Sequence, residues 1–226
     1  MPHQLQPLLC FRTSRPDSKV AWTIDISPIE PDSLVEAAQA SMRCHRFNAA
    51  ARGFSVRELE HWSTLPDHHA LCVRVTNGRT DHGVVGLLVC HADEEDFIAD
   101  AFMLEEAFLG LGIEFEMVDV LARLAFASGC GAVVLHLTHS DNNHLVRAFY
   151  AGLGQAMETL SSGDEEVAFA SLAVDDVLAA AKRTWRNSAL TTSHGLDARM
   201  PVAPPPLYAI VYTPAASLHR DNAAGR

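Results

Sequence analysis

The hydrophobic period of the sequence changes on either side of two closely spaced glycines, and this change constrains the fold more than any other feature. Residues Phe97 to Leu104 form a strand-like apolar run, whereas Ile113 to Ser128 repeat apolar side chains at helical spacing. The run Leu109-Gly110-Leu111-Gly112 lies between them. Because the first N–H groups of a helix lack intrahelical partners and carry the positive end of the helix dipole, this order predicts a phosphate-binding turn. Gly-x-Gly also occurs in ordinary tight turns, so the run alone leaves both interpretations open.

The other predicted elements indicate a mixed α/β domain. The β-rich runs Ala70 to Val75, Gly83 to Cys90 and Phe97 to Leu104 are separated by turn residues and predict an antiparallel meander. The nearly continuous apolar run Ala132 to Thr138 follows the long helix and predicts a strand that pairs in parallel. We also expect a strand at Val20 to Ile26, a helix capped by Asp32-Ser33, a helix opened by a capping box at Ser55 and Glu58, a helix over Asn142 to Ala151, a strand over Val167 to Leu172, and a helix from Asp175-Asp176 to about Arg183.

Composition narrows the class of partner. Asp and Glu number 28 against 17 Lys and Arg, and the formal charge of −11 argues against nucleic acid or an anionic membrane as a main partner. No apolar run approaches the roughly 18 residues that cross a bilayer, and the first residues lack the pattern of a signal peptide. The five cysteines are scattered without a C-x-x-C pair, and the twelve histidines lack metal-ligand spacing. We therefore expect a cytoplasmic protein without disulfides or a metal.

Prolines mark the two ends of the chain. We expect a flexible N-terminal arm over residues 1–18, one domain over residues 19–186, and a Pro-rich C-terminal extension over residues 187–226. Within that extension, the apolar stretch Leu207 to Tyr212 would suit an edge strand or a cover for the partner subunit of a homodimer.

A second motif gives the glycine turn a context. Asn143 stands seven residues before Tyr150 in a predicted helix that ends in Tyr-Ala-Gly-Leu-Gly. Together, and in this order, the two motifs resemble the GNAT acetyltransferase superfamily, in which Q/R-x-x-G-x-G/A opens the helix that binds the diphosphate of coenzyme A. Gly110 and Gly112 match this pattern, whereas Ala107 replaces its leading Arg or Gln. The resemblance implies an α/β (α+β) fold, with a mixed sheet of six to seven strands that is splayed between the fourth and fifth strands and flanked by helices.

The sequence is more closely similar to the GNAT-like C-terminal domain of FkbH-like proteins, over roughly Trp22 to Met157. Those proteins work on acyl groups tethered to carrier proteins in polyketide and related assembly lines. The chain departs from them at Glu105-Glu106-Ala107, where they have a Ser-Cys-Arg run, so thiol chemistry at that position is excluded. The phosphatase-like domain that precedes theirs is not in this sequence. The similar segments are Arg46-Phe47-Asn48, Asp81 through Gly86, Asp100 through Leu104, Gly110 through Glu114, and Asn143 through Gly154.

The resemblance implies the parts of an acyl-transfer site. The pantetheine arm of the donor would enter the splay as an extra strand, with backbone N–H groups near Leu104 to Glu106 polarising the thioester carbonyl. Tyr150 corresponds to the GNAT tyrosine that faces the thioester sulfur and would protonate the departing thiolate. Asn143 would position the arm, or the turn between the strand Ala132 to Thr138 and its own helix. Alternatively, it would cap that helix. The residues expected to hold the donor are Leu104, Glu105, Leu109, Gly110, Leu111, Gly112, Ile113 and Asn143.

An amine acceptor with a pKa of about 10.4 is mostly protonated at neutral pH, so a base must take its proton. Glu106 is the first candidate for this base, because it follows the strand on the side open to the acceptor. The alternative is that Glu105 and Glu106 only complement the positive helix N-terminus. Asp100 and His136 are secondary candidates. The best basic patch for the acidic face of a carrier protein, or otherwise a solvated stripe, consists of Arg43, Arg46 and Arg52.

The sequence therefore predicts an N-acyltransferase that moves an acyl group from a pantetheine thioester to the amine of a small molecule, in natural-product biosynthesis. The donor is an acyl carrier protein or acyl-coenzyme A, used as a co-substrate without a covalently bound cofactor. The alternatives are a non-catalytic module that binds a carrier protein or acyl-coenzyme A, and an O-acyltransferase.

Overall fold

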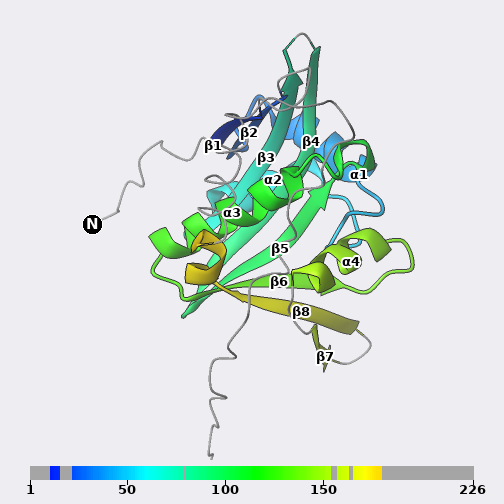
Figure 1. The fold of residues 1–226 in the computed structure, drawn as a ribbon. Helices are drawn as coiled ribbons and strands as arrows, with labels where there is room; N and C mark the ends of the chain where they lie inside the picture. The colour runs from blue at the N-terminus through cyan, green and yellow to red at the C-terminus, as the bar shows by residue number, and fades with distance from the viewer. Residues whose placement is uncertain (1–10, 16–21, 79, 154–156, 163–164, 180–226) are drawn as a thin grey trace, which may run out of the picture.

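The computed structural model describes residues 11–15, 22–78, 80–153, 157–162 and 165–179 (Figure 1). These residues form one eight-stranded sheet in the order β1-β2-β3-β4-β5-β6-β8-β7. Neighbouring strands are antiparallel except β5 and β6, which run parallel. The strands are β1 (Phe11–Arg15), β2 (Trp22–Pro28), β3 (His68–Asn77), β4 (Thr80–Asp93), β5 (Asp96–Leu104), β6 (Ala132–Thr138), β7 (Glu158–Ser162) and β8 (Glu165–Ala173).

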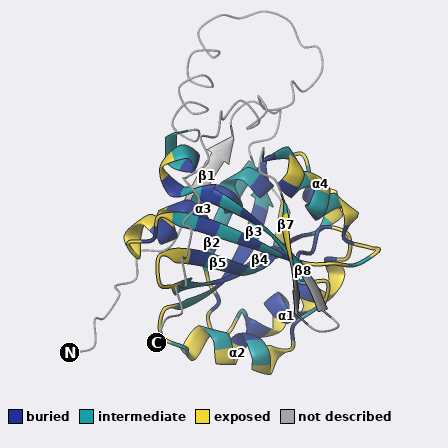
Figure 2. Ribbon diagram, turned by 90° about the horizontal axis from the view of Figure 1, so that it is seen from below, coloured by how far each residue is buried: buried dark blue, intermediate teal, exposed yellow. Residues whose placement is uncertain are grey.

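Helices cover both faces of the sheet (Figure 2). Helices α1 (Leu34–Arg43) and α2 (Val56–Thr64) lie on one face, here called the α2 face. Helices α3 (Ile113–Ala127) and α4 (His144–Gly152) lie on the other, here called the α3 face. A 3-10 turn, η1 (Glu106–Phe108), leads from β5 toward α3, and residues 174–179 are helical after β8.

Each face has its own apolar core. On the α2 face, Ala37 of α1 and Leu59 of α2 belong to a buried cluster with Val89 and Met103 of the sheet. The α3 face holds the larger cluster, which includes the apolar stripe predicted for α3. The buried residues of that stripe are Ile113, Met117, Val120, Leu121 and Leu124. Both faces of β4 and β5 contribute to these clusters. In β6, only the residues on the α3 face (Val133, Leu135 and Leu137) are buried, so the expectation that this apolar strand is covered on both faces is wrong.

The expected mixed α/β GNAT fold, with an antiparallel meander and one parallel pair, is confirmed. The sheet has eight strands rather than six or seven, because β1 and β7 add edge strands that the apolar pattern did not reveal. Strand β1 lies within residues 1–18, where we expected no regular structure. An edge strand is held by backbone hydrogen bonds on one side only, so its sequence needs no strong apolar alternation. The extension over residues 187–226 and the predicted helix beyond residue 179 lie outside the described residues.

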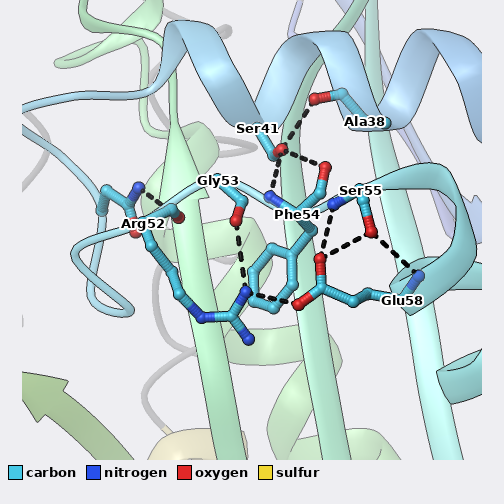
Figure 3. A network of polar contacts seen from close by, with 8 residues as sticks. Ala38, Ser41, Arg52, Gly53, Phe54, Ser55 and Glu58 are labelled. Atoms are coloured by element: carbon cyan, nitrogen blue, oxygen red, sulfur yellow. Dashed lines mark hydrogen bonds and ion pairs between the residues drawn. The ribbon is translucent and has the colours of Figure 1, made fainter.

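The α1–α2 loop is anchored where it meets α2 (Figure 3). Ser55 Oγ accepts the Glu58 N–H at 3.3 Å and Glu58 Oε2 accepts the Ser55 N–H at 2.8 Å, so the predicted capping box is confirmed. Arg52 donates to Glu58 Oε1 at 2.7 Å, and Ser41 Oγ accepts the Phe54 N–H at 2.8 Å. Ser33 occupies the N-cap position of α1 without a side-chain cap, since its hydroxyl bonds to the backbone of Glu30 instead.

Candidate active site

The parallel pairing of β5 with β6 stops partway along both strands. The ladder runs from Asp96 and Ala132 to Ala99 and Leu135. It does not reach residues 100–104 of β5 or residues 136–138 of β6. We call the interval between these unpaired halves the wedge, with its closed end at Ala99 and Leu135. The predicted splay of the sheet is therefore present.

A segment of the α1–α2 loop, residues 47–49, lies in the open end of the wedge. It is hydrogen-bonded to both strands: Ala49 N donates to Phe102 O at 3.1 Å, Leu104 N donates to Phe47 O at 3.0 Å, and Thr138 N donates to Ala49 O at 2.9 Å. The chain thus supplies its own short strand where the pantetheine arm was expected. The Leu104 N–H, one of the groups predicted to polarise the thioester carbonyl, already has an acceptor here.

Buried side chains fix this segment in place. The Phe47 ring packs against Phe102 and Phe149, with centroid distances of 5.8 and 5.4 Å. Asn143 Nδ2 donates to Asn48 O at 3.3 Å and to Thr138 O at 2.7 Å. Asn143 therefore does not cap α4 with its side chain but ties the loop to the end of β6.

Both asparagines near the wedge keep an unused acceptor. The Asn48 amide donates to Cys44 O at 2.9 Å and to Arg52 O at 3.0 Å, and the Asn143 amide is similarly committed. Because both nitrogens are used as donors, the orientation of each amide is set. The two Oδ1 atoms are buried and have no hydrogen-bond partner in the part of the chain that the structure describes.

Tyr150 lies on the α3 face beside the wedge. Its side chain is completely buried and meets the Phe102 ring edge-on, with 5.8 Å between centroids. Its hydroxyl has no hydrogen-bond partner among the described residues, although buried tyrosine hydroxyls usually find one. Burial raises the pKa of the phenol well above its ordinary value, so the hydroxyl keeps its proton. A buried donor without an acceptor suits a group that a ligand brings.

The glycine turn has the expected backbone, but one of its N–H groups is used within the chain. Gly110 and Gly112 have φ angles of 77° and 79°, which favour glycine, and Gly112 is the N-cap of α3. The Gly110 N–H donates to Oε1 of Glu114 at 3.1 Å, and Glu114 is buried in the first turn of the helix. A carboxylate of the chain itself therefore occupies part of the turn where a phosphate was predicted, and Ala107 adds no cation.

The carboxylates that follow β5 are ion-paired. Arg43 contacts Glu105 at 2.7 Å and Arg46 contacts Glu106 at 3.3 Å. The Glu105 N–H donates to Val85 O at 2.8 Å. Glu106, the first candidate for the base, is thus paired with a cation beyond the open end of the wedge. The same pairs leave little uncompensated positive charge on the predicted basic patch.

Asp100 and His136 come together at the closed end of the wedge, on the α2 face. Asp100 Oδ1 lies 3.7 Å from His136 Nδ1, and Asp100 Oδ2 lies 2.7 Å from Nδ1 of His91 on β4. The His91 ring stacks on His68 of β3 at 4.8 Å between centroids. The sequence analysis missed His91 and His68, because their proximity depends on strand register. A signal for His91 existed, since it continues the alternation of β4 toward the face of Val89.

Cys44, which lies near Glu105, is not a nucleophile. Cys44 is buried, and burial together with the charge of Glu105 raises the pKa of its thiol to about 12, although Arg43 opposes the shift. The thiolate form is therefore negligible near neutral pH. No three His, Cys, Asp or Glu side chains in the described ranges are placed to share a metal ion. Among the helices that the structure describes, none has the length and apolarity needed to cross a membrane.

The sheet splits within its parallel pair, and a glycine turn leads from one split strand into a helix, as expected for the GNAT fold. Residues 34–155, more than half of the chain, match the model of the Acetyltransferase (GNAT) family. The chain therefore belongs to this family, and acyl transfer is its class of chemistry.

Solved structures share this fold at low identity. The GNAT domain of S. lividans PAT is 14% identical, with a TM-score of 0.53 over 73% of this chain and 97% of that one. An acetyltransferase from Thermus thermophilus is 15% identical, with a TM-score of 0.50 over 66% and 96% of the two chains. Ard1 from Thermoplasma volcanium is also 15% identical, with a TM-score of 0.50 over 66% and 97%. No curated protein matches the sequence.

Proposed function

We propose that the protein transfers an acyl group from a pantetheine thioester to the amine of a small-molecule acceptor, in natural-product biosynthesis. The proposal depends above all on one observation: the hydroxyl of Tyr150 is buried and lacks a partner among the described residues, beside a wedge in the sheet. A thioester in the wedge would give this hydroxyl a sulfur atom to protonate. The acyl group and the particular amine are not defined by these residues.

The chemistry follows from this placement. The amine nitrogen attacks the thioester carbonyl carbon, so that a C–N bond forms and the C–S bond breaks. One amine proton passes to a base, and Tyr150 Oη gives its proton to the departing sulfur. The products are an amide and a free thiol, and Tyr150 regains a proton from solvent. Since burial raises the pKa of Tyr150, the group is protonated at the start of each cycle.

Binding of the donor includes displacement of residues 47–49. The arm takes the place that these residues hold between β5 and β6, and it gains the backbone groups of Phe102, Leu104 and Thr138 that now bond to the loop. The buried Oδ1 atom of Asn143, which lies outside the displaced segment, is an acceptor suited to an amide N–H group of pantetheine. Only molecules in which the loop has moved can bind the donor. The apparent affinity is therefore the intrinsic affinity multiplied by the fraction of such open molecules.

The glycine turn favours a carrier-bound donor over coenzyme A. Coenzyme A brings a diphosphate, whereas the arm on a carrier protein brings a single phosphodiester. The Glu114 carboxylate at Gly110 repels either anion, but the more highly charged group more strongly. The net charge of −11 acts against an acidic carrier protein, so the contact with a carrier would have to be local.

The test presents the protein with an acetylated carrier protein and with acetyl-coenzyme A in parallel, together with a panel of amines. Released thiol and the mass of the acylated product are followed together. Transfer to an amine with release of one thiol per product supports the proposal. Transfer only to a hydroxyl group would make the protein an O-acyltransferase. Binding of both donors without turnover would favour the non-catalytic module, for which the filled wedge is the supporting observation.

A further inference from the structure

Asp100 and His136 were the secondary candidates for the base in this reaction. The structure brings them together and places His91 beside Asp100. We propose that His136 accepts the amine proton, that Asp100 stabilises the resulting imidazolium, and that His91 is a positioning residue for Asp100. The proposal rests on the acyl transfer proposed above, and it assigns the acceptor amine to the α2 face of the sheet.

The three residues meet at the closed end of the wedge. The β5–β6 ladder ends at Ala99 and Leu135, so Asp100 and His136 are the first residues beyond it on the two strands. An irregularity in the β4–β5 register between Val89 and Cys90 leaves Asp100 without a paired residue on β4. Asp100 lies two residues after Ile98, which pairs with His91, so its side chain is on the α2 face, where its carboxylate reaches His91. The bulge places Ala101 on this face as well.

His91 is held too firmly to be the base itself. Its Nδ1 lies 2.7 Å from Asp100 Oδ2, its ring stacks on His68 with an interplanar angle of 9°, and it also contacts Trp62 of α2 at 6.4 Å between centroids. The side chain of His91 is 21% exposed. Its role is therefore to orient one carboxylate oxygen, which leaves the other oxygen of Asp100 facing His136.

His136 has the access that a base needs. Its side chain is 36% exposed, and its Nδ1 lies 3.7 Å from Asp100 Oδ1, within ion-pair distance but too far for a hydrogen bond. With Nδ1 toward the carboxylate, Nε2 is the nitrogen on the far side of the ring. A proton taken at Nε2 creates an imidazolium next to Asp100, which stabilises it electrostatically.

The acid and the base then lie on opposite faces of the sheet. Tyr150 belongs to the core of the α3 face, whereas His136 and Asp100 lie on the α2 face with the wedge between them. A thioester in the wedge can expose its sulfur to one face and its carbonyl carbon to an amine arriving from the other. Glu106 is less suited, since it lies beyond the open end and is paired with Arg46.

Two further titratable groups of the described residues lie on this side of the sheet near His136. His68 reaches the cluster only through His91. Glu158 of β7 and His136 of β6 both pair with Phe169 of β8, so their side chains lie on the same face. Strand β8 separates Glu158 from His136. The protons balance as follows. Before attack, one proton of the ammonium form passes through His136 Nε2 to solvent. A second proton passes from the attacking nitrogen to His136 Nε2 as the amide forms, Tyr150 protonates the departing sulfur, and both residues then exchange protons with solvent.

The experiment compares wild type with His136→Asn, Asp100→Asn and Glu106→Gln, using acetyl-coenzyme A or the acetylated carrier protein and the best amine found for wild type. We expect His136→Asn to lower kcat/KM at pH 7 by about 100-fold or more, the usual contribution of a general base. Its activity should recover as the pH approaches the pKa of the amine, which then needs no base. The donor Kd should be unchanged. Asp100→Asn should lower kcat/KM and distort the acidic limb of its pH profile.

The matched control is His61→Asn, on the exposed side of α2, which should behave as wild type. Full activity of His136→Asn, or a loss that high pH does not rescue, would overturn the assignment while the acyl transfer of wild type stands. A loss confined to Glu106→Gln would transfer the role to Glu106. Failure of wild type to acylate any amine would overturn the proposed function and this inference with it.

Discussion

Oε1 of Glu114 lies 3.1 Å from the backbone nitrogen of Gly110, so a carboxylate of the chain occupies the turn that sequence assigns to phosphate. Glutamate is favoured in the first turn of a helix for the same electrostatic reason that phosphate is. In the proposed function, a donor phosphate would therefore compete with Glu114 for one positive helix end. The charge of the donor would then determine selectivity.

Replacing Glu114 by Gln should improve the use of coenzyme A. The amide removes one negative charge beside Gly110, and we expect the Kd for coenzyme A to fall about tenfold while the Kd for pantetheine, which carries no phosphate, stays unchanged. Isothermal titration measures both. Glu116→Gln is the matched control, with the same charge change on the same helix turn. Equal effects of the two variants on coenzyme A would mean that net charge, rather than the contact with Gly110, sets the affinity.

Replacing Tyr150 by Phe should separate activity from stability. Loss of the acid should lower kcat by roughly 100-fold or more, because thiolate departure is no longer assisted. The free energy of unfolding should not fall, since the hydroxyl has no hydrogen-bond partner among the described residues and its removal relieves a desolvated polar group. Denaturant unfolding measures the change in stability, and thiol release measures the change in kcat. Unchanged turnover would remove Tyr150 from the mechanism.

Replacing Phe47 by Leu should loosen the segment that fills the wedge. We expect the free energy of unfolding to fall by about 1–2 kcal/mol and the donor Kd to fall as well, because the open state becomes less costly. Phe54→Leu is the matched control, as it alters an equally buried ring of the same loop in the α2-face cluster. It should lose similar stability without binding the donor more tightly. A weaker donor complex for Phe47→Leu would show that the segment is part of the site rather than an obstacle.

The capping box of α2 should make stability depend on acid. Hydrogen bonds from the Ser55 backbone and side chain, together with Arg52, lower the pKa of Glu58 to about 2 from an ordinary value of 4.5. A lowered pKa means that the stabilisation is fully present above pH 4.5 and is lost as the pH falls toward 2. Glu58→Gln should therefore be less stable than wild type at pH 7, with a difference that shrinks over this interval. Glu60→Gln, exposed on the same helix, should show no such convergence in acid unfolding curves.

Local features of the fold were predictable because their causes are local. Each of these features depends on residues that are close together in the sequence. Examples are the stripe of α3, the capping box at Ser55 and the strand Ala132 to Thr138. Strands β1 and β7 were missed because an edge strand is selected by its partner's backbone rather than by its own apolar pattern.

The site was predictable only in part, because its contacts join distant segments. Asp100 was a secondary candidate, but its contact with His91 depends on the pairing of β4 with β5, whose register the sequence does not reveal. Residues 47–49 bond to the strands of the wedge through backbone groups, and the contacts of this segment with Phe149 and Asn143 join parts of the chain that are far apart in the sequence. Glu114 falls outside the apolar stripe of its helix, and only the fold of the turn places its carboxylate at Gly110.

A crystal structure with an acyl-pantetheine analogue, in which a methylene group replaces the thioester sulfur, would test the proposed donor site directly. The analogue cannot be cleaved, so it reports where the arm lies before reaction. We predict that the arm displaces residues 47–49, that the methylene group faces Tyr150 Oη, and that the carbonyl carbon is open toward His136. An arm bound outside the interval between β5 and β6, with the bonds of Ala49 to Phe102 and Thr138 intact, would rule out the wedge as the donor site.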